Sequence, residues 1–200
     1  FVERGVLIPR PETELLVEYI IDKYESKEKT TILDLCTGSG AIAVSLAHYL
    51  KHATVTAVDK FAVCFNAARR NASYHSVTDR VTVMLADILL DFEPNQKFDC
   101  IVSNPPYIKN EDLASLLPDV KNYEPKYALD GGRDGLVFYR HIAWFAAEHL
   151  LCNGSLVLEI GFDQGESVKS IIEKTNAFHS IDITKDLSGL DRMVTAIKGD

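Results

Sequence analysis

The sequence has few cysteines, no long apolar run and no excess of basic residues, and each shortage excludes a class of protein. Its four cysteines, at positions 36, 64, 100 and 152, are far apart and form no Cys-x-x-Cys pair. Three of them sit inside apolar patterns, so we expect these to be small buried side chains rather than redox groups, which fits a reducing compartment. The six histidines show no metal-ligand spacing, so no metal is expected.

The chain also lacks a membrane signal. No stretch approaches the roughly 20 apolar residues of a membrane span, and nothing resembles a signal peptide. The expected location is therefore the cytoplasm, with no membrane partner. Phe1 is not an initiator methionine, so we expect residues that precede it to be missing.

Acidic residues outnumber basic ones by 29 to 21, which gives a formal charge of −8. Lys and Arg form no cluster, whereas nucleic-acid-binding domains usually carry a basic face. Direct nucleic-acid binding is therefore not expected, while a protein substrate is compatible with this charge. The 200 residues, 46 % of them hydrophobic, suit one globular domain over residues 1–200.

Candidate strands and helices alternate along the chain. Residues 1–14 form an extended lead-in and the start of a first helix, where Pro11 and the acidic residues near it favour a helix N-terminus. Apolar patterns then predict strands at 31–35, 54–58, 81–85, 98–103, 154–160, 178–184 and 192–197, and helices at 41–50, 61–75, 136–151 and 164–174. This order predicts an α/β fold, a doubly wound and mainly parallel sheet with helices on both faces. The long polar stretch 109–135 is typical of a binding loop or lid.

The first predicted strand runs into a glycine-rich turn. Gly38 to Ala43 fits the nucleotide-binding pattern G-x-G-x-x-A directly after a strand. Glycines let the backbone approach a ligand closely, and a helix N-terminus favours an anionic group. The candidate cofactor-binding residues of this turn are Cys36, Thr37, Gly38, Ser39 and Gly40.

Two aspartates end the next two predicted strands. Asp59 lies about 20 residues past the glycines, where a ribose-hydroxyl acceptor is expected, although it could instead cap the helix that begins near Phe61. Asp87 could accept a hydrogen bond from an adenine amino group, with Ile88 packing on the ring, or be a plain turn residue. These features admit either NAD or S-adenosylmethionine.

The turn after the strand at 98–103 reads Asn104-Pro105-Pro106-Tyr107. Both prolines have a fixed φ and no N–H, so the strand must end here and the turn is stiff. Ligands bind at strand carboxyl ends in parallel sheets, where this turn presents an amide oxygen, a bare carbonyl and an aromatic ring. Two acceptors and a ring suit a planar NH₂ group, which predicts an amino-group methyltransferase rather than a dehydrogenase. The alternative is that Asn104 only bonds its own backbone, as turn asparagines do.

Together these residues resemble the protein-glutamine methyltransferases that modify peptide chain release factors, the HemK/PrmC type. The resemblance covers nearly the whole chain. Its motifs are Val6-Leu7-Ile8-Pro9-Arg10-Pro11-Glu12-Thr13-Glu14, Asp34-Leu35-Cys36-Thr37-Gly38-Ser39-Gly40, Asn104-Pro105-Pro106-Tyr107, Tyr123-Glu124-Pro125, Asp130-Gly131-Gly132-Arg133-Asp134-Gly135 and Leu187-Ser188-Gly189-Leu190-Asp191-Arg192. The lead-in, Glu-Pro and Asp-Gly-Gly motifs are the selective ones.

The resemblance implies a Rossmann-like class I methyltransferase fold with seven strands, the last of them antiparallel, and S-adenosylmethionine as donor. It also implies transfer to the amide of the glutamine in the release factor's Gly-Gly-Gln motif, and a helical N-terminal docking domain before Phe1. The catalytic candidates are Asn104, Pro105, Pro106 and Tyr107, and Asn104 is also a candidate cofactor contact. The family usually has glycine where this chain has Cys36, whose side chain we expect to point away from the donor's methionine portion.

The main rival is an amino-methyltransferase that acts on DNA or RNA bases. It shares the donor and the Asn-Pro-Pro-Tyr turn, but it should show a basic groove, which a charge of −8 does not favour. A dehydrogenase is the more distant alternative, and the nucleotide that the protein binds would identify it.

Overall fold

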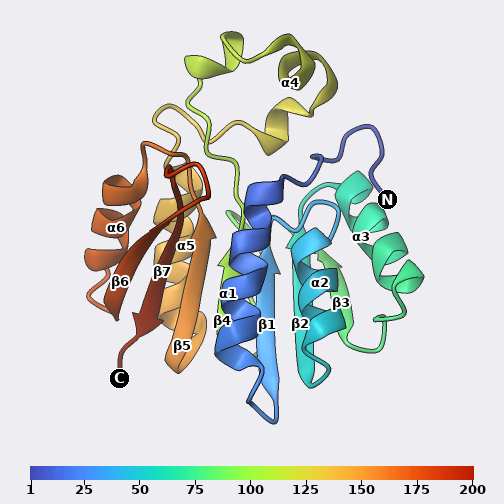
Figure 1. Ribbon diagram of the computed structural model, residues 1–200, viewed down its shortest axis with the longest axis vertical. Coiled ribbons are helices and arrows are strands. Elements are labelled where there is room, and N and C mark those ends of the chain that lie inside the picture. The colour runs from blue at the N-terminus through green and yellow to red at the C-terminus, as the bar shows by residue number, and fades with distance from the viewer.

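A seven-stranded sheet in the order β3-β2-β1-β4-β5-β7-β6 forms the centre of the computed structural model (Figure 1). The structure describes the backbone of residues 1–200 and the side chains of residues 1–120 and 123–200. The strands are β1 (Thr30–Leu35), β2 (Ala53–Asp59), β3 (Val81–Leu85), β4 (Phe98–Ser103), β5 (Leu150–Glu159), β6 (Phe178–Lys185) and β7 (Asp191–Lys198). Strands β1 to β5 pair in parallel, whereas β7 is antiparallel to both neighbours. The predicted mainly parallel sheet with an antiparallel last strand is confirmed.

Helices cover both faces of this sheet. The α-helices that follow or precede the strands are α1 (Glu14–Tyr24), α2 (Ala41–Tyr49), α3 (Ala62–Tyr74), α5 (Val137–His149) and α6 (Gly165–Glu173). Helices α1 and α2 pack with one buried cluster, and α5 and α6 pack with a second cluster on the other face. Within the described residues, no helix is both long and apolar enough to cross a membrane.

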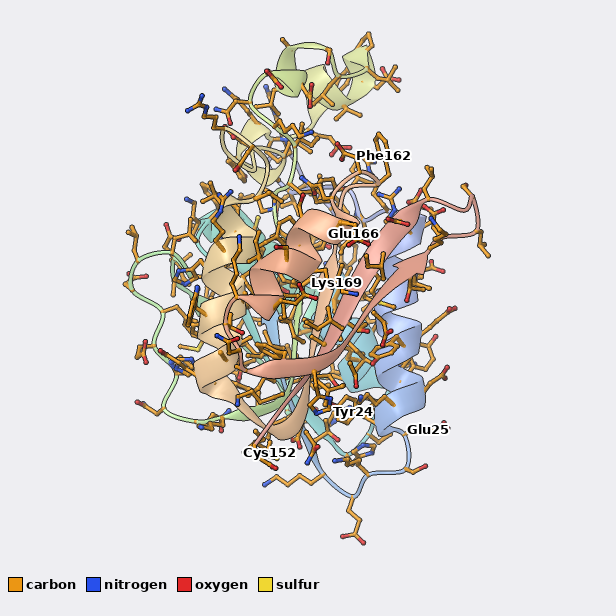
Figure 2. All side chains as sticks on the ribbon, turned by 90° about the vertical axis from the view of Figure 1, so that its left-hand side faces the viewer. Tyr24, Glu25, Cys152, Phe162, Glu166 and Lys169 are labelled. Carbon is orange, nitrogen blue, oxygen red and sulfur yellow. The ribbon has the colours of Figure 1, made fainter. Side chains whose placement is uncertain are left out.

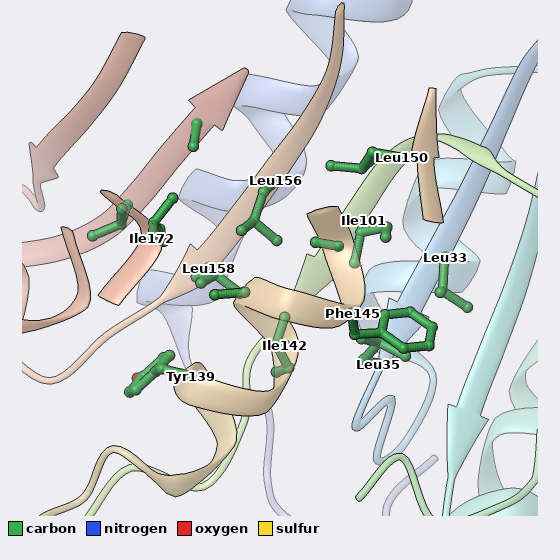
Figure 3. Close-up of a cluster of buried hydrophobic side chains, with 14 of the residues drawn as sticks. Leu33, Leu35, Ile101, Tyr139, Ile142, Phe145, Leu150, Leu156, Leu158 and Ile172 are labelled. Atoms are coloured by element: carbon green, nitrogen blue, oxygen red, sulfur yellow. The ribbon is translucent and has the colours of Figure 1, made fainter. Parts of the chain in front are cut away.

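The central strand β1 is buried on both sides, and only Thr31 of its six residues is partly exposed, as is typical of a strand inside a parallel sheet. Because side chains alternate across a strand, Ile32 joins the cluster under α1 and α2, whereas Leu33 and Leu35 join the cluster under α5 and α6. Figure 3 shows the second cluster, in which the α5 side chains face Leu156 and Leu158 of β5. Each fully buried side chain of this kind contributes about 1.5–3 kcal/mol.

The strand order reverses between β1 and β4, and this reversal positions the site. In a doubly wound sheet, ligands bind outside the carboxyl ends of the strands at such a switch point. The glycine turn follows β1 and the Asn-Pro-Pro-Tyr turn follows β4, so both lie at this switch point. The stretch 109–135, which we call the cap segment, stands above the same edge of the sheet (Figure 1).

The observed elements match the predicted ones within a few residues, with two informative differences. The cap segment is not a plain loop, because it contains η2 (Asp112–Ala114), α4 (Pro118–Tyr123) and η3 (Lys126–Ala128). Strand β5 begins at Leu150 rather than at 154, since Leu150 pairs with Phe98 before an irregularity in the ladder. Asn153 adopts a φ of 60° there, which accords with a bulge within the strand at this irregularity.

Candidate active site

The glycine turn between β1 and α2 is built over the buried carboxylate of Asp34. Its Oδ2 accepts hydrogen bonds from the Thr37 hydroxyl at 2.5 Å and from the amide of Ala43 at 3.2 Å. Gly38 has a φ of +58°, and a Cβ placed on it would meet nothing within 4 Å. The turn therefore offers open space directly beside its backbone, where a ligand can approach.

Asp59, at the end of β2, ties this turn to the start of α3. Its two carboxylate oxygens accept hydrogen bonds from the amides of Gly38, at 2.9 Å, and Phe61, at 3.0 Å. Asp59 lines the pocket, and its bond to Phe61 holds the residue just before α3 without being a side-chain cap of that helix. That it accepts a ribose hydroxyl stays a prediction. Burial raises the pKa of its carboxyl, and the hydrogen bonds from Phe61 and Gly38 oppose that rise.

Asp87 lies beyond β3 and is more exposed. Its Oδ1 accepts a hydrogen bond from the amide of Leu89 at 3.0 Å, as a turn aspartate does. Lys60 lies 3.4 Å from its Oδ2 in a partly exposed ion pair. The next residue, Ile88, is buried and packs with the cluster under α5 and α6.

These residues surround one pocket at the switch point, which encloses about 850 Å³ when the space open to solvent is included. That size lies within the range of small-molecule and cofactor sites. The wall comprises Leu7, Pro9, Thr13, Cys36, Thr37, Gly38, Ser39, Ala41, Ile42, Val58, Asp59, Lys60, Phe61, Cys64, Ala86, Asp87, Ile88, Asn104, Pro106, Tyr127, Ala128 and Phe138. The lead-in, the sheet edge and the cap segment all contribute to it.

The lead-in and the cap segment meet over this pocket. Arg10 forms an ion pair with Glu124, whose side chain is only 4 % exposed. The Tyr127 hydroxyl donates a hydrogen bond to the carbonyl of Gly5, and its ring stacks on Phe61 with centroids 3.6 Å apart. The Arg10–Glu124 ion pair therefore joins the lead-in to the cap segment.

The Asn-Pro-Pro-Tyr turn is held by partners on three other elements. The Asn104 amide Nδ2 donates to the Thr13 hydroxyl at 3.2 Å, and that hydroxyl donates to Glu159 Oε2 at 2.6 Å. Within the part of the chain that the structure describes, the Pro105 carbonyl and Asn104 Oδ1 accept no hydrogen bond. These two oxygens can therefore accept hydrogen bonds from N–H groups of a ligand.

Gln164, just before α6, fixes the far end of this turn. Its Nε2 donates to the carbonyls of Tyr107, at 3.0 Å, and Gly135, at 3.3 Å. Its Oε1 accepts from the amide of Gly161 at 3.0 Å and lies 3.5 Å from the buried Tyr139 hydroxyl. Because both polar atoms of the Gln164 amide form hydrogen bonds, this side chain holds the backbone segments around it in one arrangement.

The Asp-Gly-Gly stretch of the cap segment lies directly against the same turn. The amide of Ile108 donates to the Leu129 carbonyl at 2.9 Å, and the amide of Gly131 donates to the Ile108 carbonyl, also at 2.9 Å. A Cβ on Gly131 would lie 2.7 Å from the Cα of Tyr107. Only glycine leaves room for the two backbones to pass here, which explains this part of the motif.

Comparisons with known proteins agree with this arrangement. The family model described as "Methyltransferase small domain" matches residues 11–158. A release factor glutamine methyltransferase of Clostridium acetobutylicum is 42 % identical over 99 % of this chain and 70 % of that protein. One of Thermodesulfovibrio yellowstonii is 40 % identical over 96 % of this chain and 69 % of that protein. The chain belongs to the release factor glutamine methyltransferase family.

Solved structures show that the methyltransferase has a widespread fold. A ribosomal protein L11 methylase of Lactobacillus delbrueckii has a TM-score of 0.69 at 22 % identity, covering 100 % of this chain and 84 % of that one. A methyltransferase of Pyrococcus furiosus has a TM-score of 0.71 at 19 % identity, covering 100 % and 89 %. These likenesses support the class I methyltransferase fold.

The family and the fold imply S-adenosylmethionine as methyl donor, and the pocket fits this group. The donor carries positive charge on its sulfonium and amino groups, and Asp59 and Asp87 line the pocket. Beneath the glycine turn, Asp34 Oδ1 is a buried acceptor without a hydrogen-bond partner among the described residues. The two acidic residues of the wall, Asp59 and Asp87, favour a cationic ligand. No group of three or more His, Cys, Asp or Glu side chains in the described residues could hold a metal.

Most of the predicted cofactor residues of the methyltransferase line this pocket, namely Cys36, Thr37, Gly38, Ser39, Asp59, Asp87, Ile88 and Asn104. Gly40 does not line it. It adopts a φ of +79°, and a Cβ there would lie 3.0 Å from Ala68 on α3; a cofactor contact of Gly40 stays a prediction. Glycine at this position lets α2 begin close to α3.

Two of the four predicted catalytic residues line the pocket and two do not. Asn104 and Pro106 line the pocket, whereas Pro105 and Tyr107 do not. Tyr107 is half-buried and packs against the cluster under α5 and α6, and burial raises its pKa to about 12. That its ring faces the substrate stays a prediction, as do the roles of Pro105 and Pro106.

Cys36 lies on the wall of the pocket and also packs against the cluster under α5 and α6. Its φ of 60° is in the left-handed region that favours glycine, which accords with the glycine that the family usually has here. Burial is the main cause that raises the pKa of its thiol above the ordinary range, so it is a neutral wall residue. Which portion of the donor it faces stays a prediction.

Three polar residues of the site were not found by sequence reasoning: Thr13, Glu159 and Gln164. In the sequence, Thr13 reads as part of a helix start, Glu159 as a residue within the predicted strand at 154–160, and Gln164 as a helix start. The one signal in the sequence is that Glu159 is an acid within an apolar strand. The structure shows that it is only 1 % exposed, and buried acids are almost always paired.

Proposed function

We propose that this methyltransferase uses S-adenosylmethionine to methylate the side-chain amide nitrogen of the glutamine in the Gly-Gly-Gln motif of a class 1 peptide chain release factor. The observation that carries the proposal is that relatives about 40 % identical over nearly the whole chain are release factor glutamine methyltransferases. In this role the enzyme acts in the cytoplasm and modulates translation termination.

The proposed chemistry begins from the low reactivity of an amide nitrogen, whose lone pair is delocalised into the carbonyl. Bound S-adenosylmethionine supplies a methyl group activated by a sulfonium. In our proposal, Asn104 Oδ1 and the Pro105 carbonyl, which have no partner among the described residues, accept the two N–H groups of the glutamine. Two such bonds orient the nitrogen and favour the positive charge that develops on it during transfer.

The turn does this work only because its geometry is fixed. Gln164 holds the Tyr107 carbonyl at 3.0 Å, and Gly131 packs against the Tyr107 backbone. Preorganised acceptors need no rearrangement at the moment of transfer. A general base would not be required beforehand: the N–C bond would form as the bond between the methyl group and sulfur breaks, a neutral thioether would leave, and the nitrogen would then release its extra proton to solvent. We propose that the Tyr107 ring packs against the aliphatic part of the glutamine.

A methyl-transfer assay with substrate variants tests the proposal. Full-length enzyme and S-adenosylmethionine with a labelled methyl group are incubated with a release factor, with its Gln→Asn variant in the Gly-Gly-Gln motif, and with mixed RNA and DNA. We expect label in the wild-type factor alone, because shortening the side chain withdraws the amide from the acceptors. Label in nucleic acid instead would keep the amino-group chemistry but contradict the proposed substrate, and equal label in both factors would contradict the proposed site.

A further inference from the structure

Three elements that are distant in sequence converge on the Asn104 side chain. Thr13 comes from the 3-10 helix before α1, Asn104 follows β4, and Glu159 ends β5. Thr13 is 7 % exposed and Glu159 is 1 % exposed. The Thr13 hydroxyl lies between the other two, 3.2 Å from Asn104 Nδ2 and 2.6 Å from Glu159 Oε2.

The hydrogen count of this chain permits one arrangement. An ionised carboxylate only accepts hydrogen bonds, and a threonine hydroxyl has a single proton to donate. Because Thr13 donates that proton to Glu159, its oxygen can only accept from Asn104. The NH₂ group of Asn104 must therefore face Thr13, and its Oδ1 must face the other way.

We propose that Thr13 and Glu159 are positioning residues for methyl transfer, which fix the Asn104 carboxamide with its acceptor oxygen toward the substrate amide. The inference rests on the proposed function, because it concerns how Asn104 receives the glutamine NH₂ group. If the carboxamide were flipped, its NH₂ group would face the NH₂ group of the substrate, and its oxygen would face the Thr13 oxygen, so neither hydrogen bond could form. The loss of one such buried hydrogen bond should lower the rate of transfer by about tenfold to a hundredfold.

The Glu159 carboxyl is held by the groups that surround it. Burial raises its pKa, with Glu12 acting in the same direction, whereas hydrogen bonds from Thr13 and Asn104 and the charge of Arg192 oppose that rise and favour the ionised form, which only accepts hydrogen bonds. The Tyr139 hydroxyl donates to the backbone carbonyl of Glu159 at 2.9 Å. This bond holds the end of β5 in place independently of the hydrogen bonds that link Asn104, Thr13 and Glu159.

Paired substitutions at Thr13 separate positioning from folding. Thr13→Val exchanges the hydroxyl for a methyl group of similar size, and Thr13→Ser keeps the hydroxyl. In the full-length enzyme we expect kcat of Thr13→Val to fall by about tenfold or more, while the dissociation constant of S-adenosylmethionine stays within about twofold. Thr13→Ser should keep most of the wild-type kcat. A kcat of Thr13→Val within about twofold of wild type, or an equal loss in Thr13→Ser, would overturn the inference.

Glu159→Gln provides a second variant that is independent of Thr13. Its amide can donate as well as accept, so the Thr13 hydroxyl is no longer forced to accept from Asn104. We expect kcat to fall by about tenfold with the affinity for S-adenosylmethionine unchanged. An undiminished kcat in this variant would contradict a role for the carboxylate.

An NMR measurement reads the orientation without any reaction. In the full-length protein labelled with ¹⁵N-asparagine, we expect the Nδ2 protons of Asn104 to show nuclear Overhauser contacts to Thr13, and these contacts to weaken in Glu159→Gln. Their absence in the wild-type protein would overturn the inference. If the contacts are present but the wild-type enzyme does not methylate a release factor, the proposed function fails while the orientation of Asn104 stands.

Discussion

The backbone amide of Gly38 donates a hydrogen bond of 2.9 Å to the carboxylate of Asp59, which lies 21 residues further along the chain. The same carboxylate accepts from the amide of Phe61 at 3.0 Å. One side chain at the end of β2 thus fixes both the glycine turn and the start of α3. Because this carboxylate also lines the pocket, donor affinity should depend on it.

We predict that Asp59→Asn weakens binding of S-adenosylmethionine by about tenfold to a hundredfold, because its NH₂ group would oppose one of the two amide donors. Isothermal titration calorimetry of the full-length protein measures this affinity. Asp163→Asn is the matched control, since Asp163 is an exposed acid paired with Lys109 outside the pocket wall. Equal affinities of the two variants would contradict the role given to Asp59.

Gly131 should affect turnover more than donor binding. A Cβ at this position would lie 2.7 Å from the Cα of Tyr107, so Gly131→Ala must displace the Asn-Pro-Pro-Tyr turn. A displacement of this kind reduces kcat by about a hundredfold when reacting groups lose alignment. Steady-state kinetics test this, with Gly199→Ala as control because a Cβ there has its nearest contact at 3.5 Å. Wild-type kcat in Gly131→Ala would show that the turn tolerates the shift.

The Arg10–Glu124 ion pair should hold the cap segment over the pocket. Glu124 is 4 % exposed, so Arg10→Ala leaves a buried carboxylate without its partner, which costs about 3 kcal/mol. We expect faster amide hydrogen exchange across the cap segment in that variant. Arg140→Ala is the comparison, because Arg140 and Asp134 are both about half exposed and such pairs contribute less than about 1 kcal/mol. Similar exchange in the two variants would argue against a brace.

Asp34 should make stability depend on pH. Burial raises its pKa from 3.8 to about 7, so between these values the folded protein binds more protons at this carboxyl than the unfolded chain. The contribution of Asp34 to the free energy of unfolding is therefore present at low pH and is lost as pH rises toward 7. We predict that Asp34→Asn, which does not titrate, gains stability relative to wild type between pH 5 and about pH 7.5. Urea denaturation across this range measures the difference, and a constant difference would contradict the raised pKa.

The sequence predicts those parts of the site that local patterns encode. Gly38 and Asp59 each sit at the end of a recognisable apolar strand, and parallel strands bring their carboxyl ends to one edge of the sheet. Asn104 follows from the same reasoning, because the two prolines after it end β4. Position along the chain and fold class are together sufficient to place these three residues in one pocket.

The partners of these residues depend on long-range packing that no local pattern reveals. Thr13 meets Asn104 only because the lead-in crosses the edge of the sheet, and Glu159 reaches Thr13 only because β5 lies beside β4. In the same way, Gln164 donates a hydrogen bond to the Tyr107 carbonyl and Gly131 packs against the Tyr107 Cα, although both are distant from it in the sequence. Figure 2 shows Phe162, on the loop before α6, at this same end of the molecule beneath the cap segment.

The most direct test of the account is tandem mass spectrometry of a release factor incubated with S-adenosylmethionine and either wild-type enzyme or its Asn104→Ala variant. The account predicts one added methyl on the amide nitrogen of the Gly-Gly-Gln glutamine with wild-type enzyme. With Asn104→Ala it predicts a loss of about a hundredfold or more in that product, at nearly unchanged donor affinity. A methyl group elsewhere on the factor, or full modification by Asn104→Ala, would contradict it.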